Sequence, residues 1–467
     1  MPQSVLPRSL FLRLSPLLLC GCIMLSSLTA HAQSFQLMRF DEDYSYLKDS
    51  TRNFYQSIKF VPLSADNEIY ASFGGEARLE YAAFDNEDWG AHNIGHDNFL
   101  LQRYDVHADL HLGSRIRFFA QLRSAWEDGR QTGPRPIDED KLNIQNLFAD
   151  VSAVKNAKDS LTFRIGRQEM DYGSGRLISV REGPNLRLYF TGAKAMFAAK
   201  GLHIDAFAMM ADTVNPGAFD NKPSKELNLW GVYGTAKLHG QESLDFYYIG
   251  IRRDSAIFEE GTEKEIRHTI GSRFWRSGGG FIYNLEAAYQ FGTFGQGNIS
   301  AWTGSADVGY VFDQLASKPS INLRNDYISG GENTATGTLN TFNPIYPKGG
   351  YFGFDPQIGP VNLIDIHPYA TINVRPNIIL QADVVCNWRY SLQDGLYRPS
   401  GNFNLPGAGS DKRYIGTSYL VSGVWIISRF LTFNTGVQYF HTGAFIDSVI
   451  PDAKNGLFID SRIGYKF

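Results

Sequence analysis

Cysteine is almost absent from this chain, which has three in 467 residues. Cys20 and Cys22 lie in an apolar stretch near the N-terminus that has the pattern of an export signal, so the processed chain would keep only Cys386. A single thiol in an oxidising compartment forms no internal disulfide bond. The stability of the exported chain must therefore come from a closed network of hydrogen bonds.

A strong net charge is also lacking, because 44 Lys and Arg stand against 48 Asp and Glu. Composition gives no support for binding nucleic acid, and we expect no such partner. No G-x-S-x-G elbow occurs, and Gly173-Ser174-Gly175 lacks the third glycine, the helix and the lysine of a nucleotide-binding loop. We therefore expect no enzyme activity, no catalytic residue and no cofactor, with a barrel enzyme or a surface-binding protein as minor alternatives.

Metal-binding patterns are weak. His107 and His111 stand four residues apart, which on a strand separates them by about 13 Å, too far to share one metal ion. We expect both to line a lumen, and we expect no metal site. Two loop sites stay open as alternatives, one at His92, His96 and Asp97, and one for calcium at Asp85, Glu87 and Asp88.

The N-terminal stretch has the order of a secretory signal. Arg8 and Arg13 precede an apolar run, Leu14–Leu28, and Ala30-His31-Ala32 follows it. This arrangement predicts a signal peptide over residues 1–32 and a mature chain that begins at Gln33. Cleavage before Cys22, as in a lipoprotein, is the alternative.

Glycine and aromatic residues are plentiful, with 46 Gly, 24 Tyr and 33 Phe. From Ile69 onward apolar and polar residues alternate with a period of two, so that Leu79 and Tyr81 fall on one side and Arg78 and Glu80 on the other. A charged face this regular suits a water-filled lumen, because Arg or Lys facing the bilayer midplane costs about 2–4 kcal/mol. The pattern predicts strands that cross a membrane, and no membrane-spanning helix.

The period-two segments predict an all-β fold, a transmembrane antiparallel β-barrel of about 18 strands, since such strands need roughly ten residues each to cross a bilayer. We expect strands to begin near residues 69, 99, 115, 142, 161, 188, 202, 227, 243, 266, 280, 299, 319, 363, 378, 413, 430 and 456. Short periplasmic turns should alternate with mostly longer extracellular loops. The barrel would span residues 68–467, after a lead-in over residues 33–67 that lies in the periplasm or tucks into the lumen.

The stretch Phe163–Phe197 is unusual because two strand-like runs flank a charged loop. Its sequence contains the motif GRQ-E-x-x-YG-x-GRL followed by REGPN-x-R-x-x-F-x-G. This motif resembles the central signature of the alginate export family of outer-membrane β-barrel porins. The resemblance extends to Leu37–Asp49 and Gly74–Tyr81. One departure is Thr191, which stands where the family usually has an acidic residue after the Phe of its F-x-G element.

The resemblance implies an outer-membrane channel of a Gram-negative-type envelope for passive export of an anionic polysaccharide such as alginate. The residues alone support a polar pore with a small cationic excess, so a general or small-anion porin of the same fold is the alternative. Expected partners are the anionic polysaccharide or small anionic solutes, outer-membrane lipid and the barrel-assembly machinery. A last strand that ends in the aromatic Phe467 resembles the terminal signal that this machinery reads.

Basic residues on the lumen face and in the signature loop are the candidate solute path. We expect the loop to fold inward, with Arg176 and Arg181 as its best candidates for facing the pore, and the alternative is that these charges pair with acids on neighbouring strands. The candidate residues are Arg103, Arg117, Arg123, Arg164, Arg167, Arg176, Arg181, Arg187 and Lys194.

Overall fold

The computed structural model describes residues 35–156, 158–332, 337–354 and 357–467. The predicted signal peptide, 1–32, lies outside the described residues. No helix among the described residues is long and apolar enough to cross a membrane. The chain divides into two units, 1–42 and 43–467, which are described separately. In the first, the short 3-10 helix η2 (Arg39–Asp41) is followed by Glu42, whose Oε1 lies 2.6 Å from Nε of Arg39.

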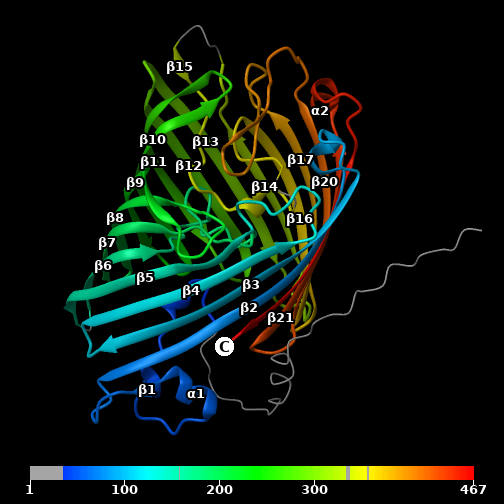
Figure 1. Cartoon of the computed structure of the whole chain (residues 1–467). Coiled ribbons are helices and arrows are strands. Elements are labelled where there is room, and N and C mark those ends of the chain that lie inside the picture. The colour runs from blue at the N-terminus through cyan, green and yellow to red at the C-terminus, as the bar shows by residue number, and fades with distance from the viewer. Residues whose placement is uncertain (1–34, 157, 333–336, 355–356) are drawn as a thin grey trace, which may run out of the picture. The chain divides into compact units, whose positions relative to one another are not determined.

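The second unit contains a closed barrel of eighteen antiparallel strands within the described part of the chain, which confirms the predicted fold and strand number (Figure 1). Each strand pairs with the next along the chain, and the last pairs with the first, so no edge is left open. The strands are β2 (Ile69–Asp85), β3 (His96–Leu112), β4 (Ile116–Asp128), β5 (Asp140–Lys155), β6 (Ser160–Gln168), β7 (Phe190–Ala199), β8 (Leu202–Thr213), β9 (Lys222–Lys237), β10 (Glu242–Phe258), β11 (Gly261–Arg276), β12 (Gly280–Phe294), β13 (Gly297–Val311), β14 (Ser320–Ile328), β16 (Leu363–Arg375), β17 (Ile378–Arg389), β20 (Tyr414–Ile426), β21 (Leu431–Thr442) and β22 (Gly456–Lys466).

The two faces of the wall follow the alternation in the sequence. On β2, Arg78 is 2% exposed and its neighbour Leu79 is 37% exposed. The same contrast separates Arg103 from Tyr104 on β3. Apolar side chains therefore cover the outer surface, whereas charged side chains point inward and are buried beneath the loops that enter the barrel.

The connections differ between the two rims. At the near rim, where β2 begins and β22 ends, neighbouring strands are joined by short turns such as 200–201 and 376–377. At the far rim two tight hairpins, 259–260 and 295–296, accompany longer connections at 86–95, 129–139, 169–189, 214–221, 329–362, 390–413 and 443–455. These longer connections carry the short elements η4 (Glu87–Gly90), β15 (Thr338–Leu339), η6 (Gly349–Tyr351), β18 (Leu396–Tyr397), β19 (Phe403–Leu405) and α2 (Ala444–Val449).

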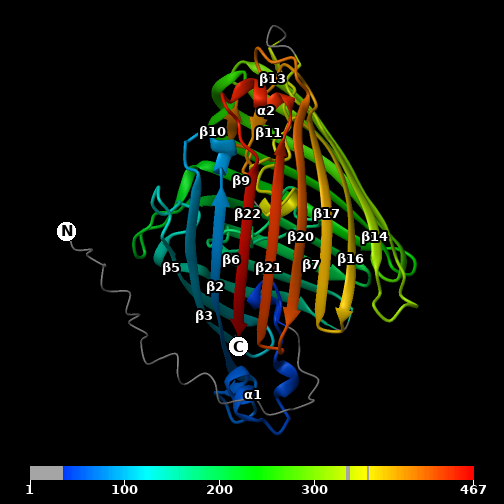
Figure 2. The same cartoon turned by 90° about the vertical axis from the view of Figure 1, so that its right-hand side faces the viewer.

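The segment before the barrel, 43–67, is ordered around aromatic contacts at the near rim. It contains η3 (Ser45–Leu47), α1 (Phe54–Lys59) and β1 (Val61–Pro62), and β1 pairs with the start of β2 (Figure 1). Figure 2 shows α1 from the side. The Phe60 ring stacks on Tyr70 of β2, with centroids 4.3 Å apart. Tyr55 of α1 lies edge-on to Phe430, in the turn between β20 and β21, at 5.1 Å. The segment thus contacts both sides of the barrel closure.

Candidate pore constriction

Two long far-rim connections run side by side within the ring of strands (Figures 1 and 2). The amide of Tyr346 donates to the carbonyl of Leu177 at 2.8 Å, and the amide of Ser179 donates back to the carbonyl of Tyr346 at 2.9 Å. The Lys348 amide adds a third backbone hydrogen bond between the two connections by donating to the carbonyl of Gly175 at 2.8 Å. The 169–189 connection, which we call the inward loop, is therefore braced by the 329–362 connection.

The inward loop turns sharply at its first half and is tied there to one side of the wall. Gly173 has φ of +61°, a left-handed conformation that favours glycine. The Tyr172 hydroxyl donates to Asp205 of β8 at 2.8 Å. The Arg176 guanidinium donates to Asp326 of β14 and lies 3.3 Å from Glu286 of β12. This half of the loop therefore spans from β8 to β14.

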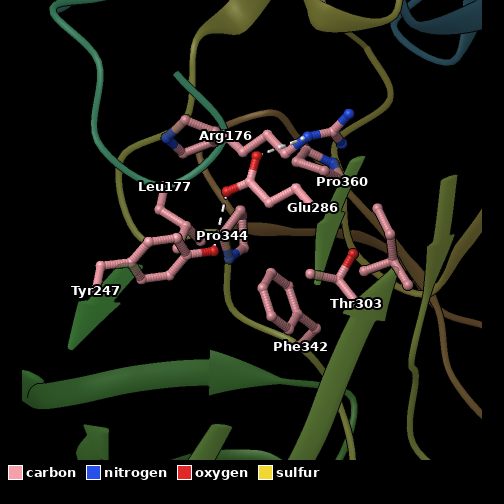
Figure 3. A pocket seen from close by; sticks show the side chains of 10 residues that line it. Arg176, Leu177, Tyr247, Glu286, Thr303, Phe342, Pro344 and Pro360 are labelled. Atoms are coloured by element: carbon pink, nitrogen blue, oxygen red, sulfur yellow. Dashed lines mark hydrogen bonds and ion pairs between the residues drawn. The ribbon is translucent and has the colours of Figure 1, made fainter. Parts of the chain in front are cut away.

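A small cavity lies beside Arg176 (Figure 3). The Tyr247 hydroxyl of β10 donates to Glu286 at 2.9 Å. The same carboxylate therefore contacts both the Tyr247 phenol and the Arg176 guanidinium. Phe342 and Pro344 of the bracing connection form the apolar side of the cavity. With its polar groups already partnered, this cavity offers little to a charged solute.

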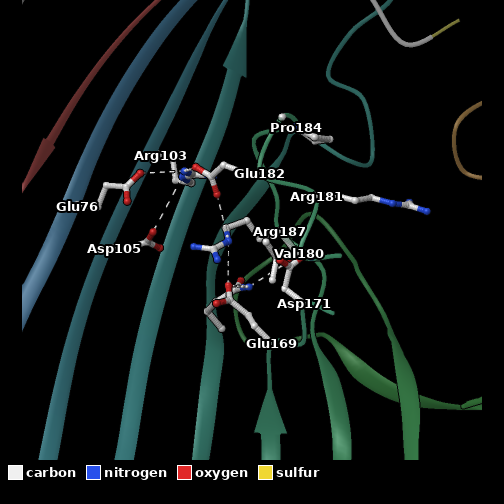
Figure 4. A network of polar contacts seen from close by, with 12 residues as sticks. Glu76, Arg103, Asp105, Glu169, Asp171, Val180, Arg181, Glu182, Pro184 and Arg187 are labelled. Carbon is white, nitrogen blue, oxygen red and sulfur yellow. Dashed lines mark hydrogen bonds and ion pairs between the residues drawn. The ribbon is translucent and has the colours of Figure 1, made fainter. Parts of the chain in front are cut away.

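The second half of the inward loop is tied to β2 and β3 through an ionic network (Figure 4). Glu182 accepts a hydrogen bond from Arg103 and lies 3.2 Å from Nε of Arg187. Arg103 also donates to Glu76 of β2 at 2.8 Å, and Arg187 lies 3.3 Å from Glu169. Arg103 and Arg187 thus tie the inward loop to the wall through acids on both sides.

The Asn185 side chain joins the loop to the wall without charge, and it is fully buried. Its amide nitrogen donates to the carbonyls of Gln102 on β3, Trp126 on β4 and Asp138, at 3.0, 3.1 and 2.9 Å. Its oxygen accepts from Arg78 at 3.3 Å. Asn185 was not among the candidate site residues predicted from the sequence, although it is the last residue of the REGPN motif.

Most of the remaining candidate cations are neutralised on the lumen face. Four of them lie beside an acid of the adjacent strand, and Arg167 of β6 reaches an acid of β8, two strands away, so the wall carries many ion pairs. The pairs are Arg117 with Asp109, Arg123 with Asp105 and Arg164 with Asp150, each at 2.7 Å, Arg167 with Asp212 at 2.5 Å and Lys194 with Asp205 at 3.4 Å.

Arg181 differs from the other candidates. Its Nε donates to the carbonyl oxygen of Pro347 at 3.0 Å, and no carboxylate of the described residues lies within 4.0 Å of its guanidinium. Its backbone has φ of +55°, a conformation that non-glycine residues rarely adopt. Burial lowers the pKa of Arg181 to about 10, so the side chain stays charged at neutral pH. Figure 4 shows it extending away from the ionic network.

Lys348 is a second cation at the same place that the sequence did not indicate. Its backbone pairs with the inward loop. Burial, together with the neighbouring guanidiniums of Arg324 and Arg176, lowers the pKa of Lys348 to about 8. Arg181 and Lys348 therefore place positive charge on the paired loops that narrow the lumen.

The histidines and acids considered for metals are engaged in other contacts. His107 stacks on Phe119, with ring centroids 5.4 Å apart, and His111 stacks on Tyr70 at 4.4 Å. In the 86–95 loop, arginines neutralise the acids, since Arg130 lies 3.0 Å from Glu87 and Arg398 lies 2.8 Å from Asp88. Within the described ranges no group of three or more His, Cys, Asp or Glu is placed to hold a metal ion.

A closed barrel with an apolar outer face, a charged inner face and loops that narrow the lumen defines a transmembrane channel of the porin type. The sequence agrees, because the family model described as "Alginate export" matches residues 69–460. The chain belongs to the alginate export family. A search of curated proteins finds no match.

Solved structures with the same fold are bacterial porins. Pseudomonas aeruginosa OpdO superposes with a TM-score of 0.56 at 12% identity, over 85% of this chain and 97% of that one. Acinetobacter baumannii OccAB1 gives 0.56 at 11% identity, over 88% and 100%. P. aeruginosa OccK2 (OpdF), solved in complex with glucuronate, gives 0.54 at 10% identity, over 85% and 96%. At these identities the likeness supports the fold alone.

Proposed function

We propose that this protein is a passive channel of the outer membrane that exports an anionic polysaccharide of the uronate type, such as alginate. The observation that carries the proposal is Arg181, a cation that lies on the inward loop with no carboxylate of the described chain within 4.0 Å. A planar guanidinium suits the carboxylates that recur along a polyuronate. Membership of the alginate export family supports the same class of solute.

The ion-paired lumen wall explains why one or two cations suffice. Arg117, Arg123 and Arg164 are matched by wall acids, so their fields largely cancel at the centre of the lumen. Arg181 lies where the loops narrow the path, and a partly desolvated constriction strengthens its attraction for anions. We therefore expect a polyanion to be attracted mainly at the constriction and to interact weakly with the wall, whose charges are balanced.

A small-anion porin of the same fold is the second candidate. The many contacts that fix the inward loop to β2, β3, β8 and β14 favour it, because a fixed loop suits single solutes better than a polymer. Under this alternative the same Arg181 would bind one carboxylate at a time. OccK2, a porin with the same fold, forms a complex with glucuronate, which is a single uronate.

Single-channel recording distinguishes the two candidates. Oligomers of uronic acid and neutral oligosaccharides of equal length are added to the purified channel in a planar bilayer. The exporter should show interruptions of the current that lengthen with uronate chain length, whereas a small-anion porin should respond to the monomer alone. Equal responses to charged and neutral oligomers would contradict both. Recovery in the outer-membrane fraction tests the location.

A further inference from the structure

Four neighbouring strands of the lumen wall carry a continuous row of oxygen-bearing side chains. Register pairs Ser305 of β13 with Asp326 of β14, Asp326 with Asp365 of β16, and Asp365 with Asn387 of β17. Directly opposed residues of antiparallel strands have Cβ atoms about 4.5–5.5 Å apart. All four side chains are buried, and Asp326 and Asp365 are both 0% exposed. The row therefore lies in a dry part of the wall.

Several oxygen atoms of this row have no hydrogen-bond partner among the described residues. They are Oδ2 of Asp326, both carboxylate oxygens of Asp365, Oδ1 of Asn387 and Oγ of Ser305. A buried polar atom without a partner is costly, and an unpaired buried carboxylate is more so. Five such atoms on four successive strands indicate that something outside the chain satisfies them.

The cations nearby do not neutralise Asp365. Arg176 contacts Asp326 through Oδ1 and also approaches Glu286, and Arg324 lies 2.8 Å from Asp307. Within the described residues no Lys, Arg or His nitrogen lies within 4.0 Å of the Asp365 carboxylate. Two adjacent carboxylates in a dry site cannot both stay ionised without a further positive charge.

We infer that Asp326, Asp365 and Asn387 form a binding site for a hard cation, with calcium as the ion that suits it. The available ligand atoms are all oxygens, two carboxylates and an amide, the set that calcium prefers over zinc. Asp365 stands in the middle of the row and bridges the other two, and the Ser305 hydroxyl lies one strand beyond Asp326. With few protein ligands the affinity should be low, with a dissociation constant of about 10⁻⁴–10⁻³ M.

Calcium titration tests the site directly. The full-length processed channel is purified in detergent, stripped with EDTA and titrated with CaCl₂ in a calorimeter at pH 7 and constant ionic strength. Wild type should show one saturable site, which Asp365→Asn abolishes. Asp447→Asn, which removes an exposed acid in α2, should leave binding unchanged. An absence of binding by wild type up to about 10 mM, well above the expected range, or undiminished binding by Asp365→Asn, would overturn the inference.

A gain-of-function variant guards against loss through misfolding. Asn387→Asp adds a third carboxylate to the row and should tighten calcium binding by about tenfold or more, since affinity rises with ligand charge. The rival is a proton shared between Asp326 and Asp365. In that case calcium would not change the melting temperature of wild type, acidification to pH 5 would raise it, and Asn387→Asp would bind no calcium. That set of results would replace the cation with a proton.

Discussion

The carboxylate of Glu182, on the inward loop, accepts a hydrogen bond from the guanidinium of Arg103 on β3. Burial alone would raise the pKa of Glu182, but the guanidiniums of Arg103, Arg187 and Arg78 hold that pKa well below its usual range. One acid of the loop thus compensates arginines of two wall strands and of the loop itself. This contact ties the second half of the inward loop to β3.

Replacing Glu182 with Gln should loosen the inward loop. The side chain is 36% exposed, so solvent screening moderates the loss, and we expect the free energy of unfolding to fall by about 1–2 kcal/mol. The measurement is urea unfolding in detergent, with Glu226→Gln, at an exposed position, as the matched control. Single channels of the variant should also fluctuate more. A steady current and unchanged stability would mean that Glu182 does not anchor the loop.

The stabilisation from Glu182 should depend on pH in a defined direction. Its folded-state pKa is depressed, so the contribution is fully present above the unfolded value of about 4.3 and is lost as the pH falls below it. The difference in stability between wild type and Glu182→Gln should therefore be constant from pH 6 to 8 and shrink in acid. A difference that grows in acid would contradict this assignment.

Asn185 should be intolerant of both removal and charge. Asn185→Ala leaves the carbonyls of Gln102, Trp126 and Asp138 without their donor, and we expect a loss of about 1–3 kcal/mol. Asn185→Asp should cost more, because it places a carboxylate oxygen against those carbonyls. Unfolding by urea measures both, and Asn402→Ala, in an exposed loop, is the control. An Asn185→Ala variant as stable as wild type would show that the donated hydrogen bonds are unimportant.

Lys348 should make the channel sensitive to mildly alkaline pH. Burial and the fields of Arg324 and Arg176 lower its pKa from 10.5 to about 8, so the folded chain releases this proton before the unfolded chain does. Stability should therefore rise between pH 8 and 10.5, and anion preference should fall over the lower part of that window as the charge is lost. Melting temperature and reversal potential measure the two effects. In Lys348→Met both pH-dependent steps should disappear, and their persistence would assign them to another group.

The wall of the barrel could be predicted from the sequence because its strands pair with their neighbours along the chain. Alternating faces and short turns such as Lys200-Gly201 determine which strands are neighbours, and Gly201 has the positive φ, +73°, that such a turn requires. Expected strand starts at residues 202, 280, 363, 378 and 456 coincide with those of β8, β12, β16, β17 and β22. The alternation of polar and apolar residues within a strand, together with the turn beside it, is enough to locate that strand in the sequence.

The constriction could not be predicted in the same way because its contacts join distant parts of the chain. Arg176 and Asp326 are separated by 150 residues, and nothing in the local pattern of either indicates the other. Arg187 pairs with Glu182 of the same loop, but Arg167 pairs with Asp212 of β8. Lys348 came from a connection whose sequence shows no charge pattern. The number of arginines in the signature loop was therefore a poor guide to the number that lack an acidic partner among the described residues.

The central claim is that Arg181, and not the arginines paired with the wall, sets the preference for anions. Arg176 resembles it in sequence context but is bound to Asp326, which makes it the matched comparison. Arg176→Gln should disturb the loop and raise current noise while anions stay preferred. Lys194→Gln, which removes a cation paired with Asp205, should change selectivity little.

Reversal potential in a salt gradient, for wild type, Arg181→Gln, Arg176→Gln and Lys194→Gln, tests this most directly. We predict that wild type prefers anions, that Arg181→Gln loses most of that preference at low salt, and that the difference shrinks at high salt as the charge is screened. The other two variants should stay close to wild type in selectivity. An Arg181→Gln channel with the reversal potential of wild type would contradict the account.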